Sequence, residues 1–247
     1  MIASEPIRRR KLSHEVLDRL LTRITRGELA AGDHLPSERD LMTLYGVGRP
    51  AVREALQALE RMGFLTITHG ERARIVAPTA RTMIDQVALS ARHFLSTSPT
   101  SLEHLKDARV FFETGMVRLA AERATEADVD LLRDRLSEHA AVAHATVSSG
   151  QHRDEFLQKD MAFHRQIAAI SGNAIYVALC EAMFEWLAEF HSGLVRVHGA
   201  ESLTITEHTT ILERIAAGDA AGAAAAMTAH LTRANALYRQ FESTAGE

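Results

Sequence analysis

Apolar residues in the first third of the chain recur first at helical and then at strand spacing. One apolar stripe covers 12–27, and shorter ones cover 38–45 and 50–62, each with apolar residues three or four positions apart. Residues at this spacing share one side of an α-helix, so three helices are predicted. The stretches 64–68 and 73–76 alternate instead, which predicts a short β-hairpin. Three helices followed by such a hairpin form a winged helix-turn-helix.

The predicted helix boundaries carry residues typical of helix ends. Ser13 is expected to cap the first helix and Ser37 the second, because a serine side chain accepts a hydrogen bond from an N–H of the first turn. Gly46 and Gly48 form the turn before the third helix. Pro50 suits the first turn of that helix, where its missing N–H costs nothing. These residues support the three helical boundaries.

After residue 78 the pattern is helical throughout, with a single proline, Pro99, and almost no alternation. The chain is therefore predicted to be mainly α, with a winged helix-turn-helix domain over 1–78 and an all-α antiparallel helical bundle over 79–247. The bundle helices are expected near 79–96, 101–123, 126–149, 151–170, 174–196, 203–217 and 219–243.

Composition adds an asymmetry of charge between the two predicted domains. Residues 1–78 hold 13 Lys and Arg against 10 Asp and Glu, whereas the rest of the 247 residues hold 15 against 22. A positive domain on an acidic chain is expected where only that domain faces phosphate. A single cysteine excludes an internal disulfide, and the sequence has neither a signal peptide nor an apolar membrane span. We therefore expect a cytoplasmic protein with no membrane contact.

Arginines are placed where a winged helix-turn-helix meets DNA. Arg49 and Arg53 lie four apart at the start of the third predicted helix, the end that meets base edges, where Arg bonds bidentately to guanine. Arg39 is better placed for phosphate, and Arg72 at the wing tip is suited to the minor groove. The alternative is that these arginines are only solvent-exposed surface residues of a helical hairpin.

One carboxylate and three histidines suggest a metal site in the bundle. Asp160 and His164 lie four apart and share one helical face. His208 and His230 each lie 11 residues from Asp219, in the turn between the last two predicted helices. In an antiparallel hairpin both would lie about 16 Å from that turn, at the same level. Such a set suits Zn²⁺, or Ni²⁺ or Mn²⁺, although each histidine taken singly is better explained as an exposed or satisfied residue.

The N-terminal segments PSERDL, GVGRPAVREALQALERMGF and THGERARI resemble the DNA-binding domain of the GntR superfamily of bacterial transcription regulators. The resemblance implies that five residues contact DNA: Arg39, Arg49, Arg53, His69 and Gly70. The wing departs from the common G-x-G pattern and instead resembles that of the N-acetylneuraminate-responsive repressors of the superfamily.

The C-terminal segments LKDARVFFETGMVRLAAERAT, DMAFHRQIAAISGNAIY and EHTTILERIAAGDAAGAAAAMTAHL resemble the FadR-type, metal-binding domain called FCD. The resemblance implies that the metal ligands are those that spacing suggested: Asp160, His164, His208 and His230. It also implies that Arg109 pairs with the carboxylate of an effector, which a buried guanidinium would neutralise. A structural salt bridge between Arg109 and Glu113 is the alternative. Because all four ligands are present, an acyl-CoA effector is not expected.

These features favour a ligand-responsive transcription regulator, a repressor in most members of the family. A homodimer would bind a two-fold-related double-stranded DNA operator, and a small carboxylate or sugar acid, such as a sialic acid, would release it. Two alternatives remain open: a metal-dependent hydrolase fused to a DNA-binding domain, and a regulator whose metal is purely structural. For the hydrolase, Glu207 is the only candidate acid or base, and it is expected to point elsewhere on its helix.

Overall fold

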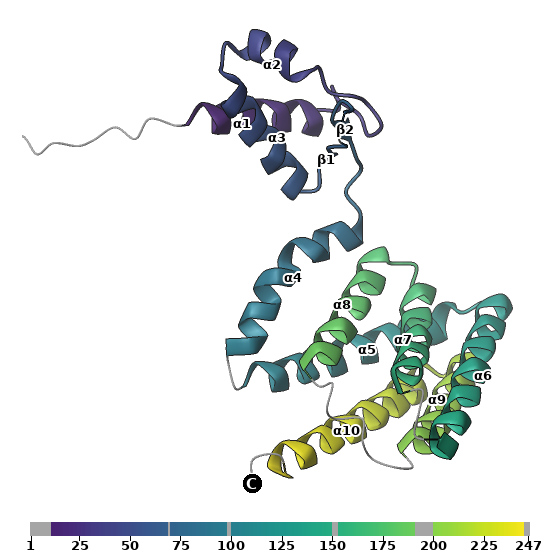
Figure 1. The fold of residues 1–247 in the computed structure, drawn as a ribbon. Coiled ribbons are helices and arrows are strands. Elements are labelled where there is room, and N and C mark those ends of the chain that lie inside the picture. Colours follow the sequence, from purple (N-terminus) through teal and green to yellow (C-terminus); the bar gives the residue numbers. More distant parts are fainter. Residues whose placement is uncertain (1–10, 69, 98–99, 150–152, 191–199, 245–247) are drawn as a thin grey trace, which may run out of the picture. The chain divides into compact units, whose positions relative to one another are not determined.

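The computed structural model describes residues 11–68, 70–97, 100–149, 153–190 and 200–244 (Figure 1). Contacts between residues divide the chain into two compact units, Met1–Gln86 and Val87–Glu247. The division falls inside a helix, and the predicted boundary at Pro78 lies just before that helix. The structure is mainly α-helical, as the apolar periodicity predicted.

The N-terminal unit packs three helices and a two-stranded sheet around one core. Its elements are α1 (Leu12–Thr25), α2 (Glu38–Tyr45), α3 (Arg49–Arg61), β1 (Leu65–Thr66) and β2 (Arg74–Ile75). Each helix contributes its apolar stripe, and the strands contribute Leu65 and Ile75, which face each other across the antiparallel pair. The predicted winged helix-turn-helix is therefore confirmed, with strands shorter than the alternating pattern suggested.

The helix ends agree with the sequence except at α1. Ser37 caps α2 in a capping box with Asp40, and Gly46 ends α2 in the left-handed conformation, at φ 63°. Gly48 precedes α3, which has Pro50 in its first turn. The prediction for Ser13 is wrong: α1 is preceded by Lys11, without a side-chain cap, and Ser13 is buried within the helix. Its hydroxyl has no hydrogen-bond partner among the described residues.

The C-terminal unit consists of α-helices wherever the structure describes it. Their bounds are α4 (Ala80–Thr97), which begins in the N-terminal unit, α5 (Ser101–Arg123), α6 (Glu126–Ser149), α7 (Arg153–Ile170), α8 (Ala174–Phe190), α9 (Ala200–Ala216) and α10 (Ala220–Thr244). The helix predicted over 174–196 is confirmed as far as Phe190, because 191–199 lie outside the described residues. The helix predicted over 203–217 begins one turn earlier than expected.

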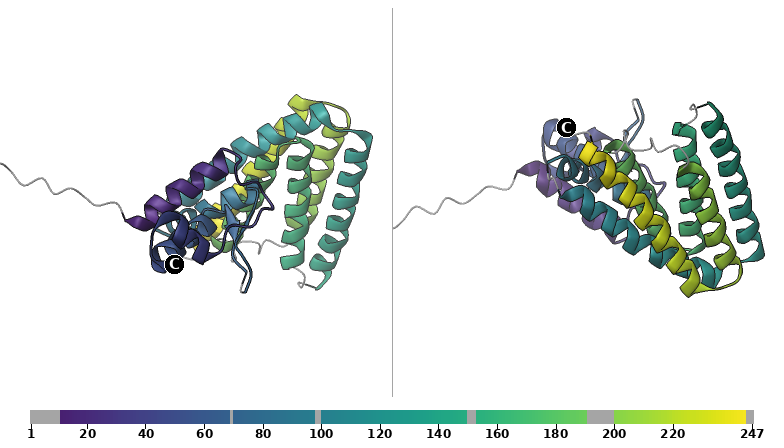
Figure 2. Two further views of the ribbon diagram at one scale, coloured as in Figure 1. Left: turned by 90° about the horizontal axis from the view of Figure 1, so that it is seen from above. Right: turned by 90° about the horizontal axis from the view of Figure 1, so that it is seen from below.

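The bundle brings α5, α6, α7, α9 and α10 around one core. α10 lies along α5, and α6 lies beside both α7 and α9 (Figure 2). Apolar residues of all five helices meet in this core, among them Val117, Leu132, Phe163, Ile211 and Met227. No helix of the described chain is long and apolar enough to cross a membrane.

Candidate metal centre and nucleic-acid interface

The arginines that the sequence assigns to DNA are exposed on the N-terminal unit. Arg49 begins α3 and Arg53 follows one turn later, while Arg39 lies in the first turn of α2 and Arg72 lies between β1 and β2. A hollow of about 370 Å³ lies between α2, α3 and the wing, with Arg53 and Arg72 in its lining. The third helix and the wing therefore each present a cation to this hollow, and α2 lines it with Glu38.

Glu38 of α2 ties both arginines of α3 to α2. Arg53 donates from Nε to the two carboxylate oxygens of Glu38, at 2.8 and 3.1 Å, and Arg49 Nε lies 3.5 Å from Oε2. The sequence pattern did not identify this residue, because an acidic residue in the first turn of a helix is explained by the helix dipole alone. The structure adds Glu38 to the candidate interface.

The wing contributes Arg72 and Gly70 to this surface. Hydrogen bonds from Ser37 lower the pKa of the Asp40 carboxyl, and Arg72 adds to the lowering through its charge, so Arg72 lies near the first turn of α2. Gly70 is exposed with φ 82°, a conformation that favours glycine. His69, the remaining wing residue assigned to DNA, lies outside the described residues.

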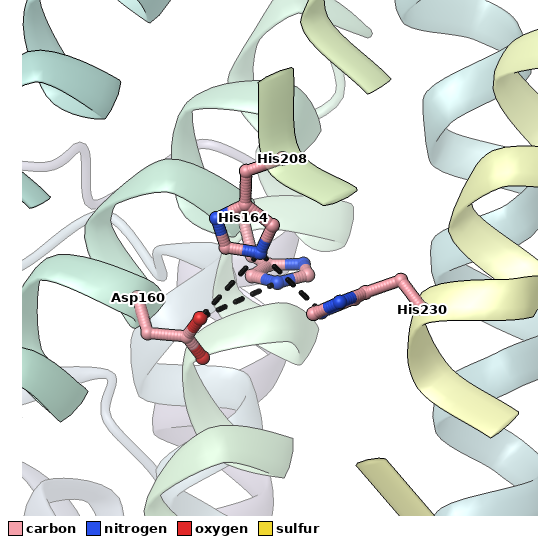
Figure 3. Close-up of side chains that lie close together, drawn as sticks. All are labelled: Asp160, His164, His208 and His230. Atoms are coloured by element: carbon pink, nitrogen blue, oxygen red, sulfur yellow. Dashed lines mark hydrogen bonds and ion pairs between the residues drawn. The ribbon is translucent and has the colours of Figure 1, made fainter. Parts of the chain in front are cut away.

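Four polar side chains from three helices converge inside the C-terminal unit (Figure 3). Asp160 and His164 come from α7, His208 from α9 and His230 from α10, and their ligand atoms all lie within 4.8 Å of one another. His208 Nε2 lies 3.3 Å from His230 Nε2 and 3.5 Å from Asp160 Oδ1. The prediction that the last two helices bring His208 and His230 to the same level is confirmed.

Burial favours the neutral form of two imidazoles of this cluster, those of His208 and His230. The side chains of His164 and His208 are fully buried, whereas that of Asp160 is 14% exposed. Burial holds the pKa of His208 well below 6.5, and it also lowers the pKa of His230. Neutral imidazoles beside a carboxylate have lone pairs to donate, which is the state that a divalent cation requires.

Two further carboxylates contact the outer ring nitrogens of the cluster. Glu113 of α5 contacts His164 Nδ1 through Oε2, and Glu207 of α9 accepts a hydrogen bond from His230 Nδ1 at 2.7 Å. Burial raises the pKa of Glu113, but Arg109 and His164 outweigh it and hold the pKa at about 2. The expectation that Glu207 points away is wrong, because α9 and α10 pack closely enough for its side chain to reach His230.

Arg109 forms the salt bridge that was the alternative to a ligand contact. Its Nε donates to Glu113 Oε1 at 2.5 Å, and both side chains are buried. The guanidinium carbon also lies 4.2 Å from the centre of the Phe184 ring. Arg109 is close enough to the cluster for its charge to lower the pKa values of His208 and His230. The residue therefore belongs to the surroundings of the centre through Glu113.

The donor set and its spacing fit a divalent cation. Two ligand nitrogens bound tetrahedrally to Zn²⁺ at about 2.05 Å lie about 3.3 Å apart, which is the separation of His208 Nε2 and His230 Nε2. Outer nitrogens that donate to carboxylates are typical of metal-bound histidines. Asp160, His164, His208 and His230 could thus hold Zn²⁺, and Ni²⁺ and Mn²⁺ accept the same donors.

Comparison with known proteins identifies two families in the chain. Residues 12–75 match the model of bacterial regulatory proteins of the gntR family, and residues 104–233 match that of the FCD domain. The HTH-type transcriptional repressor NanR of Escherichia coli strain K12 is 37% identical over 245 residues, which cover 98% of this chain and 90% of that repressor. A repressor of the same name from Shigella dysenteriae is 36% identical over the same shares.

Solved structures support the same fold. A Streptococcus agalactiae protein described as GntR aligns with a TM-score of 0.62 at 22% identity, over 90% of this chain and 98% of that one. Escherichia coli McbR/YncC aligns with a TM-score of 0.51 at 18% identity, over 94% of this chain and all of the other. The arrangement of helices is therefore shared with proteins whose sequences differ widely from this one.

Proposed function

The chain belongs to the gntR family of bacterial regulatory proteins and carries an FCD domain, and on this basis we propose that it is a repressor released by a small carboxylate bound at a metal centre. Its membership of this family and its similarity to transcriptional repressors identify the chain as a ligand-responsive, DNA-binding transcription regulator and not an enzyme. The hydrolase is not retained, since Glu207 is held by both His230 and Arg233 and is not free to act as a base.

The convergence of Asp160, His164, His208 and His230 within 4.8 Å carries the metal part of this proposal. Three imidazoles and one carboxylate leave a position open for another ligand when the cation takes five or six donors, as Zn²⁺ does when it becomes five-coordinate and as octahedral cations do. Bound there, Zn²⁺ would supply a positive charge to which an effector carboxylate binds. The side chain of Asp160 is the partly exposed member, and an effector would approach from its side.

Arg109 supports a carboxylate effector. The guanidinium carries five N–H donors, and the Nε–H is the one directed at Glu113. Glu113 keeps the side chain in place, and a guanidinium held at this position would neutralise an effector carboxylate. Because the wing resembles that of N-acetylneuraminate-responsive repressors, the effector we propose is a sugar acid such as a sialic acid.

The exposed arginines support the DNA part of the proposal. Arg49 and Arg53 at the start of α3 would bond to base edges in the major groove, and Arg39 would bind phosphate. Arg72, together with His69 and Gly70, would contact the minor groove or its backbone. Binding would replace Glu38 as the partner of the two α3 arginines.

A homodimer would place two such surfaces on a two-fold-related operator. Phe111 on α5 is 76% exposed, which is unusual for a phenylalanine, and it lines an apolar hollow of about 480 Å³ together with Phe112, Leu119 and Tyr176. A second copy of the chain would cover this surface. Effector binding would then favour one of two arrangements of the DNA-binding domains over the other.

A DNA-binding titration at fixed salt tests the proposal, with DNA from the region upstream of the chain's own gene. Binding is measured with and without a panel of sugar acids that includes N-acetylneuraminate, and Arg53→Ala serves as the binding-deficient control. Tight binding that one sugar acid releases, and that Asp160→Asn makes unresponsive, is the expected result. Tight binding that no carboxylate changes would overturn the effector part, and binding no tighter than that of Arg53→Ala would overturn the whole proposal.

A further inference from the structure

Two of the three histidines in the candidate metal centre have a partner on the ring nitrogen that faces away from it. His164 Nδ1 contacts Glu113, and His230 Nδ1 is hydrogen-bonded to Glu207 at 2.7 Å. Such outer contacts fix the tautomer and the orientation of a metal-binding imidazole. The third histidine, His208, would need an equivalent contact.

His208 Nδ1 is buried and has no hydrogen-bond partner among the described residues. Its other nitrogen, Nε2, faces Asp160 and His230. When Nε2 donates its lone pair to a cation, the proton of the neutral ring must lie on Nδ1. Loading the centre therefore creates a buried N–H donor, and a donor of this kind needs an acceptor nearby.

His139 is the polar side chain next to this donor. It lies on α6, which packs against α9, and its ring centre is 5.3 Å from that of His208. The ring is fully buried beside Phe156, and neither of its nitrogens has a hydrogen-bond partner within the described part of the chain. His139 lies outside the set of ligand atoms that converge on the centre. Two buried imidazoles, each with a nitrogen that has no hydrogen-bond partner among the described residues, thus lie next to each other.

We propose that His139 is a positioning residue of the metal centre that accepts a hydrogen bond from His208 Nδ1, directly after a small ring rotation or through one bridging water. A neutral imidazole has one acceptor nitrogen, so this contact satisfies His208 Nδ1 and the acceptor nitrogen of His139. The inference rests on the proposed metal centre and adds its third outer contact. Each metal-binding histidine then has a partner from another helix: α5 for His164, α6 for His208 and α9 for His230.

Metal affinity of the full-length chain, stripped of metal, tests this role. Zn²⁺ affinity is measured by competition with a chromophoric chelator, and the ligand field by the visible spectrum of the Co²⁺-loaded chain. His139→Leu should weaken metal binding by about 10- to 100-fold and change the Co²⁺ spectrum. His139→Asn and His139→Gln place an amide near the positions of Nδ1 and Nε2, and one of them should retain most of the affinity.

Two controls distinguish a positioning role of His139 from a role in packing, and they test separately whether the metal centre exists. His144→Leu, an exposed position on the same helix, should bind metal like the wild type. The positioning role would be overturned if His139→Leu bound Zn²⁺ as tightly as the wild type. It would also be overturned if all three His139 variants lost the same metal affinity and lost thermal stability to a matching extent without metal. A wild type that binds Zn²⁺ no tighter than Asp160→Asn would overturn the centre, and the inference with it.

Discussion

Arg109 and Glu113 form a buried ion pair one turn apart on α5, with Arg109 Nε 2.5 Å from Glu113 Oε1. The second oxygen of Glu113 contacts His164 Nδ1. The helix brings the two side chains together, because residues four apart share one face. Arg109 therefore acts on a candidate metal ligand through Glu113, in addition to any contact that it makes with an effector.

Replacing Glu113 with Gln tests whether this carboxylate supports metal binding. The amide keeps the shape of the side chain but loses the charge that orients His164, so Zn²⁺ affinity should fall by about 10- to 100-fold. Competition with a chelator measures the change. Glu122→Gln, at an exposed position on the same helix, is the control. Equal affinities in the two variants would contradict the role of Glu113.

Arg109→Ala should destabilise the metal-free chain. Loss of the guanidinium leaves the Glu113 carboxylate buried without its main cation, and breaking a buried pair in this way costs about 3–5 kcal/mol. Urea denaturation measures the free energy of unfolding. The double variant Arg109→Ala, Glu113→Gln should recover part of the loss, because no buried charge remains unpaired. A double variant that is less stable than Arg109→Ala would show that the unpaired Glu113 carboxylate is not the cause of the lost stability.

The metal-free chain should lose stability as the pH falls below about 6.5. Burial lowers the pKa values of His139, His208 and His230 in the folded state, whereas the unfolded chain takes up these protons near 6.5. The unfolded state then binds more protons, so acid favours unfolding. Glu113, with its pKa at about 2 against 4.5 when unfolded, adds a second loss at lower pH. Urea denaturation in chelator at about pH 7.5 and about pH 5.5 measures the first loss; a stability that is independent of pH would contradict it.

Removing the metal should separate the response to effector from DNA binding. If the effector carboxylate binds the cation, a chelator should abolish release by effector, while the affinity for operator DNA without effector changes by less than about tenfold, or about 1.4 kcal/mol. DNA titrations with and without chelator measure both quantities, and Asp160→Asn should reproduce the effect. Loss of DNA binding upon chelation would instead indicate the purely structural metal that the sequence left open.

Glu38→Gln tests the ion pairs between α2 and α3. The carboxylate competes with phosphate and bases for Arg49 and Arg53, so its neutralisation should increase affinity for non-specific DNA several-fold and reduce the ratio of specific to non-specific binding. Stability should change by less than about 1 kcal/mol, because exposed ion pairs contribute little. Titrations with operator and random DNA at two salt concentrations measure the ratio. A ratio that does not change would mean that Glu38 plays no part in DNA recognition.

Local patterns in the sequence predicted most of the secondary structure and several of its boundaries. Helical spacing identified the helices of both units, and Ser37, Gly46 and Pro50 marked ends of α2 and α3, because capping and turn preferences depend on neighbouring residues alone. The prediction that Ser13 caps the first helix was wrong, because serine is also accommodated inside a helix. The strands are shorter than predicted, since pairing in a two-stranded wing depends on contacts that alternation does not show.

By itself the sequence determined the winged helix-turn-helix and the helical bundle, and it placed His208 and His230 at one level. That last prediction needed only the helix rise and a turn at Asp219, both of which are local. Only the tertiary structure showed that Glu113 contacts His164, that Glu207 reaches His230, that His139 lies beside His208 and that Glu38 holds Arg53. Each of these pairs joins different helices, and their meeting depends on how the helices are rotated and packed, which no local spacing specifies.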